Sequence, residues 1–195
     1  MTNFTESLAG QTFDGVADEK KRGRFAVGTV AFAVAAAFSA QVAVPLPWTP
    51  VPVTLQPLVV ILAGAVLGPR LGAVAMAAYV TVGALGAPVF SNGGGGLGWL
   101  FGPTGGYLLA APAAAFVTGT IAGRAGTAWR LLLGLSGGVV VMYAGGVLQL
   151  MAFTGQDLGM SLAAGVAPFI VGDPTKIGFA FFALIAAGTA TRARD

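Results

Sequence analysis

The stretch VGDPTKIGFAFFALIAAGTATR, residues 171–192, has an acid and a base at one end, an arginine at the other, and an apolar run between them. A helix from Pro174 to Arg192, rising about 1.5 Å per residue, just crosses a hydrocarbon layer about 30 Å thick. Asp173 and Lys176 then lie near one membrane surface and Arg192 near the other. The stretch therefore predicts a transmembrane helix with a polar pair at its amino-terminal end.

The composition of the whole chain also indicates a membrane protein. Hydrophobic residues make up 56% and charged residues 9% of the 195 residues, and the mean hydropathy is +0.84. A soluble domain has about a quarter of its residues charged. The 31 glycines and the alanine-rich runs favour closely packed membrane helices. The sequence has no cysteine or histidine, which excludes disulfides and thiolate nucleophiles and disfavours most metal, hydrolytic and redox chemistry.

Apolar runs recur along the chain and predict an all-α integral membrane protein with six transmembrane helices. The predicted spans cover residues 25–44, 55–67, 71–85, 107–122, 131–153 and 174–191. The predicted organisation is a mobile cytoplasmic tail with a basic cluster (1–24), a transmembrane domain (25–191) and a short cytoplasmic tail (192–195). PLPWTPVPVT, residues 45–54, is too rich in proline for a helix interior, and a glycine loop covers residues 91–106.

The basic residues test this topology. If the amino terminus is cytoplasmic, every Lys and Arg except Lys176 falls on the cytoplasmic side, as the positive-inside rule expects. These residues are Lys20, Lys21, Arg22, Arg24, Arg70, Arg124, Arg130, Arg192 and Arg194. We therefore expect both termini inside, in the cell (plasma) membrane. A cleavable signal peptide is the alternative for the first span, but the basic cluster lies far into the chain and the span is long.

Asp173 and Lys176 have three interpretations. Asp is a favoured N-cap and Pro174 suits the first helical position. A lysine in the first turn, however, faces the positive end of the helix dipole. Lys176 is explained either by an ion pair with Asp173 on the same helix face or by an anion held by the ammonium group and free backbone N–H groups.

The proline-rich loop and the glycine loop are predicted on the same outer side as Asp173. Their aromatic and polar side chains suit a small, partly apolar solute. They are Trp48, Thr54, Gln56, Phe90, Asn92, Trp99, Phe101, Thr104 and Tyr107. The alternative for the Trp and Tyr residues is an aromatic belt at the membrane interface. GGGGLG is not a nucleotide-binding loop, because no Lys-Ser/Thr follows it.

Four stretches together resemble the BioY family, the biotin-binding S components of energy-coupling factor (ECF) transporters. They are TPVPVTLQPLVVILAGAVLGPRLGA (49–73), GAPVF (86–90), LGWLFGPTGGYLLA (97–110) and VGDPTKIG (171–178). The resemblance runs from about residue 25 to residue 190. It implies a six-helix membrane protein that captures biotin from outside with high affinity, is not an enzyme, and has biotin as its transported ligand rather than a cofactor.

The resemblance also implies a site. The last-helix Asp and Lys of the family match Asp173 and Lys176, so Lys176 is expected on the valerate carboxylate of biotin. Asp173 is expected to accept a hydrogen bond from the ureido ring or to orient Lys176, and Asn92 is the candidate polar residue after the third span. With the residues of the outer loops, the predicted substrate-binding residues are Asp173, Lys176, Asn92, Thr54, Gln56, Trp48, Phe90, Trp99 and Tyr107.

Energy for active transport must come from partners, because the chain has no Walker A loop and its inner loops are too short for an ATPase. The resemblance implies a transmembrane T component and two cytosolic ATP-binding subunits, beside membrane lipid and no nucleic acid. Such S components dock through small residues of the first helix. The candidate pairs are Ala31 with Ala35 and Ala33 with Ala37, and internal helix packing is the alternative.

Three other functions compete with this one. The first is an S component for another vitamin, such as thiamine or riboflavin. The second is an intramembrane enzyme that uses Lys176 as a base. The third is a passive channel, which would need polar residues along several helix faces, whereas these spans carry almost none.

Overall fold

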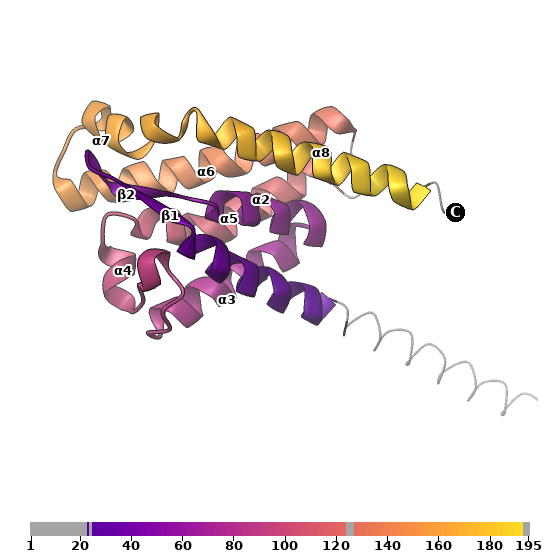
Figure 1. Ribbon diagram of the computed structural model, residues 1–195, viewed down its shortest axis with the longest axis horizontal. Coiled ribbons are helices and arrows are strands. Elements are labelled where there is room, and N and C mark those ends of the chain that lie inside the picture. Colours follow the sequence, from indigo (N-terminus) through magenta and orange to yellow (C-terminus); the bar gives the residue numbers. More distant parts are fainter. Residues whose placement is uncertain (1–22, 24, 124–126, 193–195) are drawn as a thin grey trace, which may run out of the picture.

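The computed structural model describes residues 23, 25–123 and 127–192, and shows a bundle of helices with a small β-hairpin at one end (Figure 1). The remaining residues, 1–22, 24, 124–126 and 193–195, lie outside the described part of the chain. Most of the two predicted tails, including the basic cluster, therefore falls outside it. The side chains of residues 188–192 are not described either.

Each predicted span overlaps a helix, so the approximate positions of the helices are confirmed. The first span was predicted to reach residue 44, but its helix ends at Gln41, and Ala43 and Val44 lie in a β-strand. The bounds of the helices are Phe25–Gln41 for the first helix, Gln56–Leu67 for α2, Pro69–Ala84 for α3, Gly105–Ala122 for α5, Ala128–Thr154 for α6 and Gly172–Arg192 for α8. A proline lies at the start of α2 and of α3, where its missing N–H costs no hydrogen bond.

The segment between the first helix and α2 is a β-hairpin. Strands β1 (Ala43–Leu46) and β2 (Thr49–Thr54) pair antiparallel, with Ala43 opposite Thr54 and Leu46 opposite Thr49. Its prolines were expected to exclude a helix. A two-stranded sheet tolerates them because both strands are edges, where a residue without an N–H can face outward.

Four short elements complete the described part of the chain: the 3₁₀ turns η1 (Ser91–Gly93) and η2 (Ala167–Phe169), and the helices α4 (Leu97–Phe101) and α7 (Leu158–Gly165). Asp157 caps α7 through a 2.8 Å hydrogen bond from the Met160 N–H to its carboxylate. Asp173 does not cap α8 in the same way, because α8 already begins at Gly172.

Consecutive long helices run in opposite directions, which gives the bundle two different ends (Figure 1). The hairpin, α4 and α7 lie at one end, together with the beginnings of α2, α5 and α8. We call this the loop end. The opposite end is the arginine end, because Arg70, Arg130 and Arg192 belong to the first residues of α3 and α6 and the last residue of α8. The bundle therefore separates these three arginines from the Asp173–Lys176 pair.

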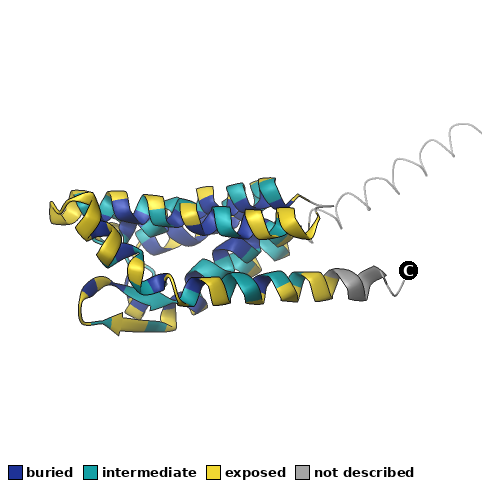
Figure 2. Cartoon of the chain, turned by 90° about the horizontal axis from the view of Figure 1, so that it is seen from above, coloured by how far each residue is buried: buried dark blue, intermediate teal, exposed yellow. Residues whose placement is uncertain are grey.

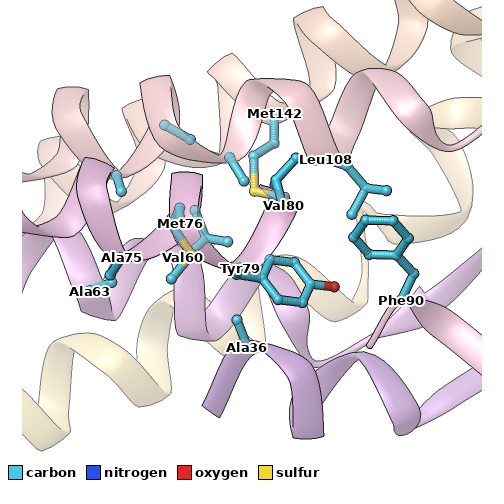
Figure 3. Close-up of a cluster of buried hydrophobic side chains, with 13 residues drawn as sticks. Ala36, Val60, Ala63, Ala75, Met76, Tyr79, Val80, Phe90, Leu108 and Met142 are labelled. Carbon is cyan, nitrogen blue, oxygen red and sulfur yellow. The ribbon is translucent and has the colours of Figure 1, made fainter. Parts of the chain in front are cut away.

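Small residues let the helices approach closely in the half of the bundle toward the arginine end. A Cβ atom added at Gly64 of α2 would collide with the Ala115 carbonyl of α5, and one at Gly119 would lie 2.5 Å from the Pro69 nitrogen. Glycine at such positions brings two backbones into direct contact. The main core cluster combines alanines with bulkier side chains, among which Tyr79 and Phe90 point toward one another (Figure 3).

The outer faces of the bundle are apolar. Buried residues lie where helices face one another, and many exposed ones are large hydrophobic side chains (Figure 2). Val140, Leu148 and Phe182 are 62–71% exposed, as is typical of surfaces that contact lipid. By length and composition, α5 and α6 can each cross a membrane, and α7–η2 with α8, bent by 47°, would make a third span. The count of six spans stays a prediction.

Candidate functional site

A cavity opens at the loop end, where β2, α2, α5, α6 and the beginning of α8 converge. About 620 Å³ of space there is free of protein atoms, with open solvent at the mouth included. Its lining residues are Val51, Pro52, Thr54, Gln56, Pro57, Phe90, Ser91, Thr104, Tyr107, Leu108, Val139, Met142, Tyr143, Phe169, Asp173 and Lys176. The wall is thus mostly apolar, with a few polar groups from different elements.

The charged part of the wall is a three-residue network. Lys176 Nζ lies 2.6 Å from Asp173 Oδ1, and the Tyr143 hydroxyl donates a 2.6 Å hydrogen bond to Asp173 Oδ2. The side chains of Lys176 and Asp173 are only 11% and 4% exposed. Both carboxylate oxygens of Asp173 are therefore engaged, while an ammonium group has three N–H donors and Lys176 spends one on Asp173.

Gln56 adds an uncharged polar group to the same wall. The residue is 7% exposed, and its Nε2 atom is buried without a hydrogen-bond partner among the described residues. A buried amide donor left unpaired costs about 1–3 kcal/mol. Such a group in the wall of an open cavity is a candidate partner for a polar ligand atom.

Aromatic side chains form the apolar part of the wall. Phe90 is fully buried and packs edge-on against Tyr79, with ring centroids 5.7 Å apart. Phe169 lies against Tyr143 at a centroid distance of 6.5 Å. The Tyr107 hydroxyl donates a 2.5 Å hydrogen bond to the Gly165 carbonyl, so it ties α5 to the end of α7 and presents its ring to the cavity.

The structure brings six of the nine predicted substrate-binding residues into this cavity: Thr54, Gln56, Phe90, Tyr107, Asp173 and Lys176. Asn92 and Trp99 line a second cavity, where about 830 Å³ of space is free of protein atoms with open solvent included; it shares Pro52, Ser91 and Thr104 with the first. Trp48 lies at the hairpin turn, is 69% exposed and lines neither cavity.

Two residues of the loop end were overlooked in the sequence. Tyr143 lies within a long apolar run of α6, and its partner Asp173 is 30 residues away. The available signal was the hydroxyl itself, because a buried tyrosine usually finds a hydrogen-bond partner. Gln41, at the end of the first helix, reaches the loop after α3: its Nε2 donates a 2.9 Å hydrogen bond to the Phe90 carbonyl.

The two candidate alanine pairs on the first helix differ in exposure. Ala33 and Ala37 pack against the main core cluster, beside the fully buried Ala36. Ala31 is exposed and Ala35 is half-buried. The pair Ala33–Ala37 thus packs inside the bundle, while the pair Ala31–Ala35 reaches the outer face.

Comparison with known proteins places the chain among membrane transporters. A model of the BioY family matches residues 17–193. The chain is 46% identical to the probable biotin transporter BioY of Pyrococcus horikoshii, over 65% of this chain and 74% of that protein. It is 41% identical to the biotin transporter BioY of Thermotoga maritima, over 68% and 78% of the two chains.

A solved structure shares the fold. The crystal structure of the S-component for biotin from an ECF-type ABC transporter matches this chain with a TM-score of 0.79. The match covers 87% of this chain and 93% of that one at 22% sequence identity. The order of six long helices and the loop-end elements therefore belongs to a known architecture.

Proposed function

The chain belongs to the BioY family, and on that premise we propose that it binds biotin in the loop-end cavity and delivers it across the membrane as the S component of an ECF transporter. The observation that carries the proposal is the buried Asp173–Lys176 pair in an otherwise mostly apolar cavity. A cation held in such a wall suits a solute with an apolar body and an anionic end.

The chemistry of biotin fits the groups of the wall. Biotin is a bicyclic urea on an aliphatic chain that ends in a carboxylate. Lys176 has two N–H donors beyond the one directed at Asp173, so it can bind the carboxylate while Asp173 compensates its charge. With both oxygens already engaged, Asp173 acts mainly by orienting Lys176, the second of the two roles expected for it.

The remaining proposed residues divide between the ring slot and the entrance. Gln56 offers its unpartnered amide N–H to the ureido carbonyl, and Thr54, Phe90 and Tyr107 enclose the fused rings. The second cavity, with Asn92 and Trp99, adjoins the first and serves as the entrance. Trp48, at the exposed turn of the hairpin, sits at the membrane interface above it.

The proposed topology has six spans in the plasma membrane with both termini cytoplasmic, so the cavity faces outside. The clustering of Arg70, Arg130 and Arg192 at the opposite end supports this orientation. Because the native chain has no cysteine, single cysteines report sidedness cleanly. A membrane-impermeant maleimide applied to intact cells should label Trp48→Cys and leave Arg130→Cys unlabelled; the reverse pattern would invert the topology.

The proposed partners are a transmembrane T component and two cytosolic ATP-binding subunits. Of the two alanine pairs, Ala31–Ala35 is the better docking candidate, since it lies toward the outer face of the first helix. Ala33 and Ala37 are already occupied by internal packing.

Uptake of radiolabelled biotin tests the function. Cells that lack their own biotin transporter would express the chain alone or with an ECF energising module. We expect saturable uptake that unlabelled biotin competes and that thiamine and riboflavin leave unchanged. Equal competition by either of the other vitamins, or no uptake by chain that has reached the membrane together with the module, would contradict the proposal.

A further inference from the structure

Among the described residues, the side-chain hydrogen bonds between the first helix and the cavity wall are those of Gln41. Its Nε2 atom donates to the Phe90 carbonyl at 2.9 Å, and its Oε1 atom accepts from the Gly93 N–H at 3.0 Å. The same Nε2 lies 3.2 Å from the Ala37 carbonyl of its own helix. The Gln41 amide thus donates to a carbonyl and accepts from an N–H of a loop about 50 residues away. It pairs with the loop backbone as a peptide group of an adjacent strand would.

The loop that Gln41 holds closes on itself. The Phe90 N–H donates to the Gly94 carbonyl at 2.8 Å, and the Gly94 N–H to the Ser91 carbonyl at 3.1 Å. Asn92 and Gly93 between them have positive φ values of 56° and 72°. The Gln41 amide pairs two of the backbone groups that these internal bonds leave free, the Phe90 carbonyl and the Gly93 N–H.

Two residues of this loop belong to the binding cavity. The Phe90 ring lines it, and Ser91 lines both the cavity and its proposed entrance. The Phe90 side chain is held by Tyr79 and Trp99, but its carbonyl is held by Gln41. The amide therefore sets where the backbone of the wall lies.

The hydroxyl groups of the first helix do not reach the loop that Gln41 holds. Thr29 and Ser39 bond only to carbonyls of their own helix. In the part of the chain that the structure describes, the side-chain hydrogen bonds that link this helix to another element are those of Gln41. The other contacts are apolar packing by residues such as Ala33 and Ala36, which resists sliding less than a directional pair of hydrogen bonds does.

We propose that Gln41 is a positioning residue for ligand retention: from the end of the first helix it holds Phe90 and Ser91 in the shape that encloses the ligand. Coupling of this kind is reciprocal. A ligand resting on Phe90 and Ser91 steadies the end of the first helix, and a shift of that helix loosens the wall. The identity of the ligand as biotin rests on the proposed function, whereas the link itself is independent of it.

The variants that test this are Gln41→Leu, which removes both bonds, and Gln41→Glu, which keeps an acceptor for the Gly93 N–H but turns an oxygen toward the Phe90 carbonyl. The matched control is Gln149→Leu. Gln149 also joins a helix to backbone carbonyls of another segment, those of Leu100 in α4 at 3.3 Å and Gly102 at 3.5 Å. Gly102 lines the second cavity, but neither carbonyl belongs to the wall of the binding cavity, and Gln149 itself lines neither cavity.

Biotin exchange gives the first readout. With two hydrogen bonds lost, we expect the dissociation rate of bound biotin to rise about tenfold in Gln41→Leu, with little change in the association rate. Gln41→Glu should behave alike and Gln149→Leu like the parent chain. Thermal unfolding of the ligand-free variants controls for folding, and Gln41→Glu decides the matter if Gln41→Leu does not fold.

Cysteine labelling gives a second readout that needs no biotin. Ser91→Cys is the chain's single cysteine and is buried in the parent background. Its reaction with a small maleimide should accelerate several-fold when Gln41→Leu or Gln41→Glu is added and stay unchanged with Gln149→Leu. Unchanged labelling in both Gln41 variants would overturn the proposal. Absence of biotin binding by the parent chain would instead contradict the proposed function.

Discussion

The same three helices meet in two different ways along their length. In the half toward the arginine end, α2, α5 and α6 touch through Gly64, Gly119 and Gly138, and added Cβ atoms would collide with the facing helix. At the loop end, these helices carry larger residues such as Gln56, Tyr107 and Tyr143, and a cavity lies between them. Glycines also bring α5 and α6 together at the loop end, where a Cβ atom added at Gly106 would collide with the Gly145 carbonyl, but there the larger residues with polar tips surround an open cavity.

The difference assigns different tasks to the two regions. The closely packed half leaves no room for a solute and fixes the relative positions of the helices. Because the helices are fixed there, they also form a rigid support at the loop end, which holds a few polar groups at defined positions. Changes in the first region should therefore act on stability, and changes in the second on binding.

The largest expected effect is a loss of stability when the close helix packing toward the arginine end is disrupted. Gly64→Ala places a methyl group against the Ala115 backbone, and such overpacking costs about 3 kcal/mol or more, a loss of about 10 °C in Tm. Gly178→Ala in α8 is the control, because nothing lies within 4 Å of the added atom. Thermal unfolding in detergent measures both. Equal Tm values would mean that the helices do not touch at Gly64.

The second-largest effect is expected from removing the Lys176 cation at the loop end. Lys176→Ala should weaken biotin binding about 100-fold, because a charge-assisted contact is worth roughly 1.5–3 kcal/mol. Binding of biotin amide, which lacks the carboxylate, should fall far less. Arg130→Ala, at the other end of the bundle, should change neither. Equal losses for biotin and its amide in Lys176→Ala would remove the carboxylate role of Lys176.

A sharper comparison uses two of the three buried polar side-chain atoms that lack a hydrogen-bond partner among the described residues; the third is Ser161 Oγ of α7. Gln56 lines the cavity and its Nε2 atom is buried, and Thr118 Oγ1 is buried among the packed helices; neither atom has a hydrogen-bond partner among the described residues. Gln56→Met should weaken biotin binding about tenfold, yet stabilise the ligand-free protein by about 1 kcal/mol. Thr118→Val should leave binding unchanged.

Calorimetric titration and thermal unfolding, run on the same two variants, test this pair. If Gln56→Met weakens biotin binding but raises the stability of the ligand-free protein, the Gln56 amide serves the ligand and not the fold. If both quantities fall together, Gln56 is a structural residue and the ureido assignment is wrong.

The smallest expected effect concerns Tyr143. Tyr143→Phe removes the hydroxyl that bonds Asp173 Oδ2, and because the Lys176 contact remains, we expect about a fivefold loss of biotin affinity. In a Lys176→Ala background, the same change should cost less, since Tyr143 acts through the pair. Tyr79→Phe, which removes a hydroxyl bonded to the Val89 carbonyl outside the cavity wall, is the control. Full additivity would place Tyr143 in direct contact with the ligand.

Helix positions could be predicted from the sequence because the apolar runs are long and are bounded by proline, glycine or charge. The hairpin could not, since TPVPVT combines strand-favouring valine and threonine with prolines that disfavour most sheets. The start of α8 was placed near Pro174 instead of Gly172, and this matters because Asp173 is then free to bind Lys176 and Tyr143.

The cavity was predictable where short motifs carry its residues, as with Thr54, Gln56 and the Asp173–Lys176 pair. Residues that act across long sequence separations could not be found in this way. Gln41 and Tyr143 reach partners 49 and 30 residues away, and neither stands in a recognisable pattern. Trp48 shows the converse, since it directly precedes a recognisable motif but lies exposed at the hairpin turn.

Calorimetric titration of the purified, biotin-stripped chain with biotin, and then with thiamine and riboflavin, tests the central claim most directly. The account predicts saturable binding of one biotin per chain at nanomolar to low-micromolar concentration, with no heat from the other two vitamins. A folded sample that binds no biotin, or that binds all three alike, would contradict it and leave Asp173 and Lys176 as an ion pair that only stabilises the start of a helix.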